Sequence, residues 1–454
     1  MATTYLQRTN TSGTSTQKGT ISVWIKSGEE PSGNNQTTLA SWGDANNHGA
    51  ILWNGSNRID AFDYQSGGIV GQLQTNALLR DCSGWYHIVY SWDTTLSTAN
   101  DRQKVYINGV EQTYSTRTNY SQNAATSWNA NSYSVRVGGL NSSSYFSGLM
   151  SYVAFVDGTQ ELPTIFGETD TTTGQWKIKT DITPSVAWGT NGFLILKNGN
   201  SLTDESTNSN NFTLGGGTLT NTKDCPDNVF STLNPLIGAS NQPTFTNGNT
   251  TVISPSGTNA RYGGTLGMTS GKYYYEVKLL GSISNGGFGA GILNIDSFNF
   301  NTTSGISTSS NYIGVVVNSL GGTNNFYIQH GGATNDFSQT LSVGMIIGHA
   351  IDMDNGYYYV HNNGVYINSG DPTSGATGTG NINRTGNLNY DFSNLTMAIG
   401  GTSQNVDYGS FNFGNGTFGT TAVTSAGTNA SGIGIFEYDV PTGYTALSTK
   451  GLNL

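Results

Sequence analysis

The sequence carries little charge: Asp, Glu, Lys and Arg make up 10% of its 454 residues, against about 25% in typical soluble proteins. Its 18 basic and 28 acidic residues give a net charge of −10, so we expect no basic surface for a phosphate backbone and no nucleic-acid partner. No apolar run is long enough for a membrane-spanning helix, so we expect no membrane insertion. Residues 1–5 show neither a charged nor an apolar region, so we expect no Sec-type signal peptide.

Cysteine and proline are also scarce. The two cysteines, Cys82 and Cys225, are too few for a disulfide framework, so we expect free thiols and synthesis in a reducing cytoplasm. Four of the nine prolines lie between residues 226 and 255. Because proline removes a backbone donor and disfavours sheet interiors, we expect a linker at 224–245. It would separate a first domain, 1–223, from a second, 246–454.

Glycine (62 residues) and aromatic residues (11%) are abundant. Apolar and polar residues alternate at period two, as around Ile21, Val23 and Ile25. We expect strands at 21–25, 85–92, 104–110, 135–137, 150–156, 273–279, 312–317, 326–329, 345–353, 357–361, 365–368, 395–399 and 410–413. The dipeptides Asn108-Gly109 and Asn363-Gly364 favour type I′ hairpin turns. Because helical periodicity is nearly absent, sheets must pack on sheets, which predicts an all-β fold of two antiparallel, jelly-roll-like sandwiches.

Two stretches of the first half resemble a known family. Gly84–Val89 (GWYHIV) is similar to the "W-x-H-V" strand of laminin-G-like, concanavalin A-like lectin domains, and Asp101–Gly109 (DRQKVYING) is similar to the hairpin that follows it. The resemblance covers about residues 1–165 and implies a concanavalin A-like sandwich, with 166–223 as connector strands.

The second half resembles a SPRY domain. Gly271–Val277 is similar to its opening strand, and Phe411–Gly414 is similar to its closing one. Gly348–Gly356, followed by Asn363–Val365, is similar to its "D-x-D-N-G…N-G" hairpin. The resemblance implies a SPRY-like sandwich after the linker.

Further segments resemble a module common in virion proteins of tailed bacteriophages, where it joins a lectin-like domain to a SPRY domain. They are residues 166–170, 174–176, 189–193, 224–236 and, near the end, 441–447. Cys225 stands where the module usually has threonine. The resemblance implies a fibre, spike or capsid-decoration protein on the virion surface, made in the host cytoplasm. Its expected partners are other virion proteins and a host surface glycan, and the sequence is compatible with a homo-oligomer.

Concanavalin A-like folds also host glycosidases, which need two carboxylates about 5 Å apart in retaining enzymes. Glu168 and Asp170 begin such a pattern, but Thr172 and Thr173 occupy the places of the second acid, so we expect a polar turn. The five histidines lack metal-ligand spacing, and no nucleophile or phosphate-loop motif occurs. We therefore expect no catalytic residue, no enzymatic activity and no cofactor.

Three other places in the sequence carry weaker signals. Asp204, Ser206, Asn208 and Asn210 alternate like calcium ligands. However, the position that needs glycine is Ser209, so we expect a turn more readily than calcium.

Asp352 and Asp354 flank Met353 on one face of a predicted strand, where an ordinary turn is favoured over a ligand contact or an acid–base pair. His87 lies in a strand full of aromatic residues and is expected to be a satisfied core histidine.

Sugars bind to aromatic faces and to amide and carboxylate groups, and one loop after a predicted strand combines these groups. The candidate ligand-binding residues of this loop are Trp42, Asp44, Asn46, Asn47 and His48. Further candidates are Trp128, Tyr145, Asp352 and Asp354.

Together these features favour a virion surface protein whose weak glycan contacts are multiplied by copy number. The alternative is a purely architectural capsid or tail decoration or adaptor protein without a host ligand. A polysaccharide-degrading enzyme is the least favoured interpretation, because no carboxylate pair supports it.

Overall fold

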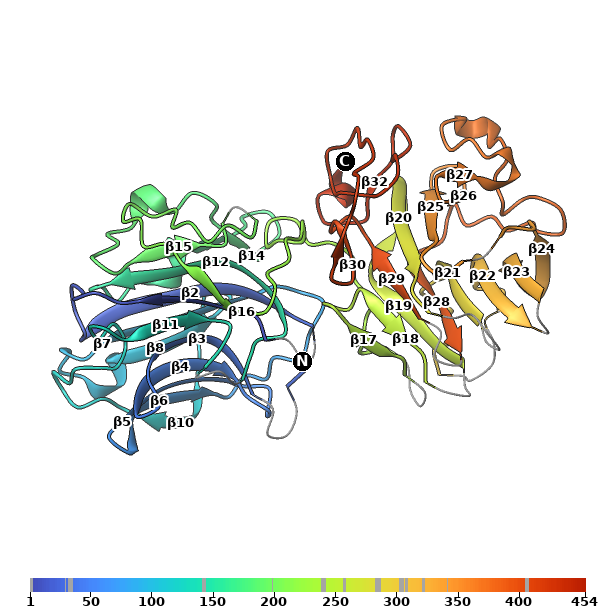
Figure 1. Cartoon of the computed structure of the whole chain (residues 1–454). Coiled ribbons are helices and arrows are strands. Elements are labelled where there is room, and N and C mark those ends of the chain that lie inside the picture. The colour runs from blue at the N-terminus through green and yellow to red at the C-terminus, as the bar shows by residue number, and fades with distance from the viewer. Residues whose placement is uncertain are drawn as a thin grey trace. The chain divides into compact units, whose positions relative to one another are not determined.

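The computed structural model describes residues 3–28, 30–31, 36–140, 144–197, 199–237, 242–255, 259–281, 287–301, 306, 309–320, 323–340, 342–404 and 408–454. They form two compact units, Met1–Asn221 and Thr222–Leu454, each built almost entirely of strands (Figure 1). Short helical turns lie at Ala99–Asp101, Pro163–Ile165, Thr183–Ser185, Ile367–Ser369, Gly375–Thr377 and Gly451–Asn453. None of the helical turns within these ranges is long and apolar enough to cross a bilayer.

The first unit is a sandwich of two antiparallel sheets. In the described residues the larger sheet has the order β10 (Tyr114–Thr118), β6 (Gly68–Thr75), β5 (Ile59–Gln65), β4 (Asn47–Trp53), β3 (Thr37–Gly43), β11 (Ser134–Val137), β1 (Tyr5–Thr9), β16 (Thr213–Gly216). The smaller sheet has the order β15 (Phe193–Ile195), β12 (Gly148–Asp157), β2 (Lys18–Ser27), β7 (Tyr86–Asp93), β8 (Gln103–Ile107), β9 (Val110–Glu111).

The core of the first unit lies between these sheets. The alternating residues Ile21, Val23 and Ile25 of β2 belong to it, as the sequence pattern predicts. Trp42 of the larger sheet meets Phe155 of the smaller one, with ring centres 5.3 Å apart. Burial of such large side chains supplies most of the driving force for this fold.

The second unit is also a sandwich. One sheet of its described part has the order β17 (Thr244–Thr246), β18 (Thr251–Ile253), β29 (Tyr408–Asn412), β20 (Lys272–Leu279), β25 (Ile346–Asp352), β26 (Tyr357–Asn362), β27 (Val365–Tyr366), and β32 (Thr445–Ala446) pairs in parallel with β20. The other has the order β19 (Asn259–Met268), β28 (Met397–Gln404), β21 (Gly287–Asn294), β22 (Tyr312–Leu320), β23 (Thr323–His330), β24 (Ala333–Asp336). A hairpin pairs β30 (Thr417–Phe418) with β31 (Thr421–Ala422). The predicted all-β class with two sandwiches is confirmed.

Both Asn-Gly dipeptides form the turns that the sequence predicts. Asn108 and Gly109 have φ angles of 49° and 81°, and Asn363 and Gly364 have φ angles of 48° and 85°. Two consecutive positive φ angles define a type I′ turn, which asparagine and glycine adopt at low cost. The turns join β8 to β9 and β26 to β27.

The connector residues after 165 are an integral part of the first unit. β15 pairs with β12, and β16 pairs with β1. The buried carboxylate of Asp157 accepts the main-chain N–H groups of Thr14 (2.7 Å), Ser15 (3.0 Å) and Asn191 (2.9 Å) and the amide of Asn129 (2.6 Å). This carboxylate therefore fastens the connector to the N-terminal segment.

A small hairpin of β13 (Gly167–Thr169) and β14 (Trp176–Ile178) covers His87. Trp176 Nε1 donates to His87 Nδ1 at 3.0 Å, and the His87 ring stacks on Trp24 with centres 4.6 Å apart. Ser22 Oγ lies 2.8 Å from Nε2. Both ring nitrogens have partners and His87 is 0% exposed, so the prediction of a satisfied core histidine is confirmed. Burial lowers the pKa of His87 to about 3.

The expected linker at 224–245 requires a correction. Phe230 is 1% exposed and bridges to Ser448, and Leu233 is 0% exposed and bridges to Gly264. Both side chains lie in hydrophobic clusters of the second unit, so their burial outweighs the proline signal. Residues 238–241 of the expected linker lie outside the described residues. The first unit ends at Asn221, and the second begins directly after it.

A buried polar row crosses β29, β20, β25 and β26 on the face that the C-terminal segment covers. Asn412 pairs with Glu276, Glu276 with Gly348, and Gly348 with His361. A Cβ on Gly348 would lie 1.9 Å from His361 Nε2, so only glycine leaves room for the imidazole to lie over β25. The imidazole Nε2 lies 2.6 Å from the hydroxyl of Tyr274.

Glu276 is the centre of this row and is fully buried. Its carboxyl oxygens accept the main-chain N–H groups of Glu437 (2.9 Å) and Tyr438 (2.8 Å), the hydroxyl of Tyr274 (3.1 Å) and the amide of Asn412 (3.2 Å). Burial nevertheless raises the pKa of Glu276 to about 7, against the lowering effect of these donors.

Candidate functional site

The candidate site lies on the larger sheet of the first unit, on the face that points away from the core, here called the outer face. On β11, Val135 and Val137 belong to the core, so the alternating residues Ser134 and Arg136 lie on the outer face. Ser134 pairs with Gly43 of β3. Two small residues therefore stand side by side on this face.

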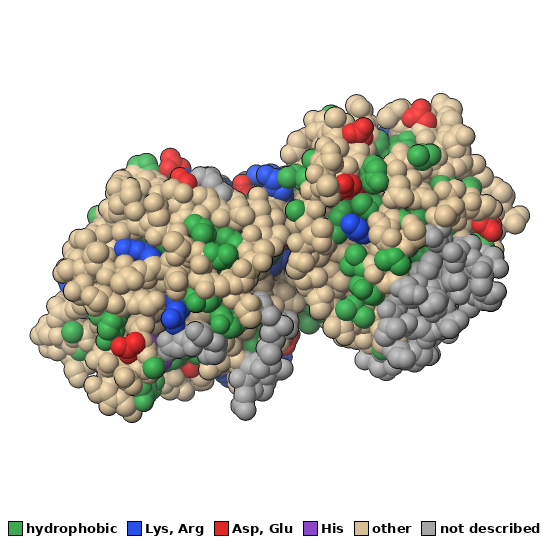
Figure 2. All heavy atoms as spheres, viewed as in Figure 1, with side chains coloured by type: hydrophobic (Ala, Val, Ile, Leu, Met, Phe, Trp, Pro, Cys, Tyr) green, Lys and Arg blue, Asp and Glu red, His purple; other side chains and the backbone are tan. Residues whose placement is uncertain are grey.

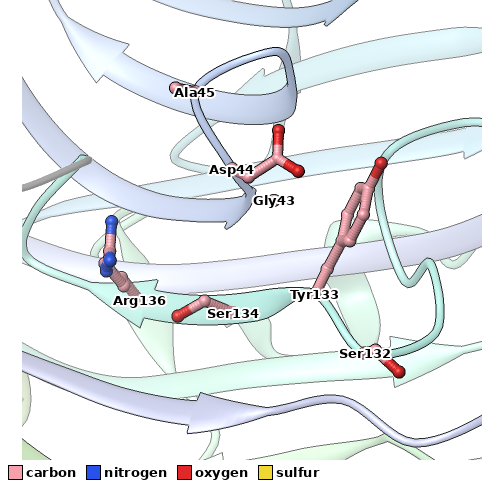
Figure 3. Close-up of a pocket in the computed structure, with 7 residues that line it drawn as sticks. All are labelled: Gly43, Asp44, Ala45, Ser132, Tyr133, Ser134 and Arg136. Atoms are coloured by element: carbon pink, nitrogen blue, oxygen red, sulfur yellow. The ribbon is translucent and has the colours of Figure 1, made fainter.

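A hollow of about 420 Å³ opens at this pair (Figure 3). Its lining comes from the end of β3 and the turn after it, and from β11 and the segment that enters it: Gly43, Asp44, Ala45, Ser132, Tyr133, Ser134 and Arg136. Gly43 has a φ angle of 119°, and a Cβ on it would lie 2.1 Å from the Asn47 carbonyl oxygen. Only glycine fits there, which leaves this part of the hollow without a side chain.

The carboxylate of Asp44 is fixed by its own turn. Oδ1 accepts the main-chain N–H groups of Asn46 (2.8 Å) and Asn47 (2.9 Å). These donors lower the pKa of the exposed Asp44, so the group is ionised at neutral pH. In Figure 3 the carboxylate turns toward the ring of Tyr133.

Tyr133 and Arg136 complete the hollow. Burial and the negative charge of Asp44 raise the pKa of Tyr133, so its hydroxyl stays protonated at neutral pH. The Arg136 guanidinium carbon lies 5.7 Å from the ring centre of Tyr5. A carboxylate acceptor, a phenol, two serine hydroxyls and a guanidinium donor can together hold a ligand rich in hydroxyl groups. The lining residues hold one carboxylate, Asp44, whereas glycoside hydrolysis usually needs two.

The prediction that Trp42 and Trp128 bind a sugar is wrong, because both side chains are buried. Trp42 is 1% exposed and Trp128 is 0% exposed, and their ring centres are 5.5 Å apart in the core. The alternation of β3 turns Trp42 inward between Ser41 and Gly43. Trp128 donates its Nε1 hydrogen to the Tyr120 hydroxyl at 3.0 Å. Neither indole has a face left for a ligand.

The other residues of the predicted loop lie at or near the hollow. Asn46 and Asn47 form the turn around Asp44, and the Asn47 Oδ1 also accepts the Ser66 N–H at 3.0 Å. His48 pairs with Gly43, and its half-buried ring stacks on Tyr64 with centres 5.4 Å apart.

Tyr145 packs against β1. Its half-buried ring has its centre 5.8 Å from that of Tyr5, the residue next to Arg136. Tyr145 is therefore linked to Arg136 through Tyr5 and does not line the hollow.

Asp352 and Asp354 have structural partners in the second unit. Asp352 is buried, accepts the Asn355 main-chain N–H at 3.0 Å and pairs with Lys272 at 2.8 Å. Asp354 lies in the turn beyond β25, where it accepts the Gly271 N–H at 2.7 Å. The strand ends at Asp352, so the two acids do not share a strand face, which corrects that expectation.

The acidic residues of the possible catalytic and calcium motifs also interact with donor groups of the protein. Glu168 and Asp170 both pair with Lys177, at 3.4 and 3.2 Å, on the hairpin of β13 and β14. The carboxylate oxygens of Asp204 accept N–H groups of Leu194 (2.8 Å) and Asn210 (2.7 Å). Within the described ranges, no three His, Cys, Asp or Glu side chains gather as a metal site.

A known protein family matches the part of the chain that holds the hollow. Residues 1–165 match the family described as the concanavalin A-like lectin/glucanases superfamily. Every residue that lines the hollow falls within this match. A search of the curated proteins finds no match.

Solved structures that match part of this chain include the SPRY domain of human HERC1, at 14% identity and a TM-score of 0.24, covering 36% of this chain and 87% of that one. They also include a heptameric SAP-like pentraxin from Limulus polyphemus, at 14% identity and a TM-score of 0.27, covering 35% of this chain and 72% of that one. Domain 4 of an arabinanase from Geobacillus stearothermophilus has 20% identity and a TM-score of 0.24, covering 32% of this chain and 63% of that one. Similarities this low carry no functional argument.

Four lining residues, Ser132, Tyr133, Ser134 and Arg136, were not predicted from the sequence. The alternation around Val135 marks Ser134 and Arg136 as outward residues, which is the signal available locally. Their proximity to Asp44 depends on the pairing of β11 with β3, two strands far apart in the sequence.

Proposed function

We propose that the protein is a non-catalytic surface protein that binds a neutral glycan in the hollow of its first unit. The observation that carries this proposal is the lining of the hollow, where Asp44, Tyr133 and Arg136 surround a floor opened by Gly43. A carboxylate accepts sugar hydroxyls, a guanidinium donates to them, and a tyrosine ring packs against C–H groups.

We further propose that this protein is a surface component of a bacteriophage virion, such as a fibre or a capsid or tail decoration. It is supported by the sequence resemblance of the connector segments to virion modules. The face shown in Figure 2 carries sparse charged side chains among uncharged ones, which suits contact with neutral host glycans. Each contact would be weak, and many copies on one particle would multiply it.

A glycan array tests the proposal. We expect the intact protein to bind a subset of neutral glycans and Arg136→Ala to reduce that binding at least about tenfold, as loss of a charged hydrogen bond predicts. The matched control is Arg80→Ala, which removes an exposed arginine outside the hollow. Tryptophan fluorescence of each variant checks that the first unit is folded.

Two outcomes would overturn the proposal. If no glycan is bound, or if Arg80→Ala weakens binding as much as Arg136→Ala, the hollow is not a glycan site and the architectural interpretation gains support. Release of reducing sugar from any bound polysaccharide would show that the protein is an enzyme.

A further inference from the structure

The hollow continues into a strip of polar and aromatic side chains on the outer face. Gly43 pairs with His48 of β4, and His48 pairs with Tyr64 of β5. Because alternate residues of a strand share a face, Phe62 and Asp60 lie on the same side as Tyr64. These strands lie next to one another in the sheet.

Aromatic rings form the middle of this strip. The His48 ring centre lies 5.4 Å from that of Tyr64 and 5.7 Å from that of Phe62. All three side chains are half-buried, so each presents part of a ring at the surface. Burial lowers the pKa of His48, which is therefore neutral at neutral pH.

Amide groups form the far end of the strip. Phe62 pairs with Gln72 of β6, and Asp60 pairs with Gln74. The amide nitrogens of Gln72 and Gln74 donate to the Asp60 carboxylate at 3.0 and 3.3 Å. The carboxylate thus holds both half-buried amides in fixed positions, as a preorganised binding surface requires.

We propose that the ligand is an extended neutral polysaccharide that lies across the strands, from the hollow over His48, Tyr64 and Phe62 to Gln72. This inference rests on the proposed glycan binding and adds the form of the ligand. Five strands, β11, β3, β4, β5 and β6, carry this path, and their spacing makes it about 19 Å long, enough for several sugar units.

The charges of the strip favour an uncharged polymer. Its acids are Asp44 and Asp60, its base is Arg136, and the whole chain has a net charge of −10. A polyanion would meet a repulsive field, whereas the hydroxyls of a neutral polysaccharide both donate and accept hydrogen bonds.

Isothermal titration calorimetry tests the inference. The ligands are fragments of increasing length, prepared from a neutral polysaccharide that the protein binds on the glycan array. We expect affinity to rise at least about tenfold from the disaccharide to fragments long enough to cross five strands. Tyr64→Ala should remove most of that gain and leave disaccharide binding unchanged, because the disaccharide occupies the hollow. The matched control, Tyr327→Ala, removes a half-buried tyrosine of the second unit and should have no effect.

The outcomes separate the two proposals. The inference of an extended ligand is overturned if the affinity does not depend on fragment length. It is also overturned if the gain in affinity with length persists in both Tyr64→Ala and Phe62→Ala. In either case the hollow remains a glycan site. Absence of binding to every polysaccharide on the array overturns the proposed function itself. Unchanged tryptophan fluorescence in the variants excludes unfolding as the cause of a lost gain.

Discussion

Glu276→Gln changes a single group at the centre of the buried row of the second unit. Two effects compete at this carboxyl. Four hydrogen-bond donors favour its ionised form, whereas complete burial disfavours that form. Burial prevails and raises the pKa from 4.5 to about 7. Glutamine has nearly the same shape but cannot ionise, so the substitution isolates the titration.

The magnitude follows from the linkage between protonation and folding. One unit of pKa corresponds to about 1.4 kcal/mol, so the shift of Glu276 amounts to about 3 kcal/mol. Because the folded state has the higher pKa, it binds the proton more tightly than the unfolded state does. The contribution to stability is therefore complete below pH 4.5 and is lost as the pH rises through about 7.

The assay can follow each unit separately. All eight tryptophans lie in the first 221 residues, so tryptophan fluorescence reports the first unit, and tyrosine absorbance and circular dichroism also report the second. Urea unfolding gives the free energy of unfolding of the wild type and of Glu276→Gln at each pH. Between pH 4.5 and pH 8, the wild type should lose about 3 kcal/mol of this free energy relative to Glu276→Gln. The tryptophan transition should stay the same. A difference that is flat across this range would show that the donors keep Glu276 ionised, and would refute the reasoning.

Two further substitutions address the first unit. Asp157→Asn places an NH₂ group against main-chain N–H donors. It should therefore lower the free energy of unfolding by about 2 kcal/mol, measured by tryptophan fluorescence in urea. An unchanged midpoint would contradict the role of this carboxylate in fastening the connector. Trp176→Ala uncovers one face of His87, so proton NMR should find the pKa of His87 raised from about 3 toward its ordinary value. No rise would mean that Trp24 and Ser22 suffice to keep the ring neutral.

Local features of this fold were predictable because they depend on neighbouring residues. The period-two pattern of β2 and the Asn-Gly turns after β8 and β26 act over two to four residues, and the structure confirms them. The same holds for His87, whose aromatic strand predicts burial. The linker prediction at 224–245 failed because proline content is also local, whereas Phe230 and Leu233 are buried by distant segments.

The candidate site shows the same limit. The sequence placed Asp44 and His48 in one loop, and the turn around Asp44 keeps them together. It could not tell which face of β3 would be covered, and this decides that Trp42 enters the core while Gly43 opens the hollow.

Composition and alternation by themselves determined that the chain forms two strand-built, sparsely charged units. Only the tertiary structure decided where the candidate site lies, because it pairs β3 with β11 and brings Arg136 and Tyr133 into the same hollow as Asp44. The physical reason is that strand pairing joins residues distant in the chain, and a shift of register by one residue exchanges every inward side chain for an outward one.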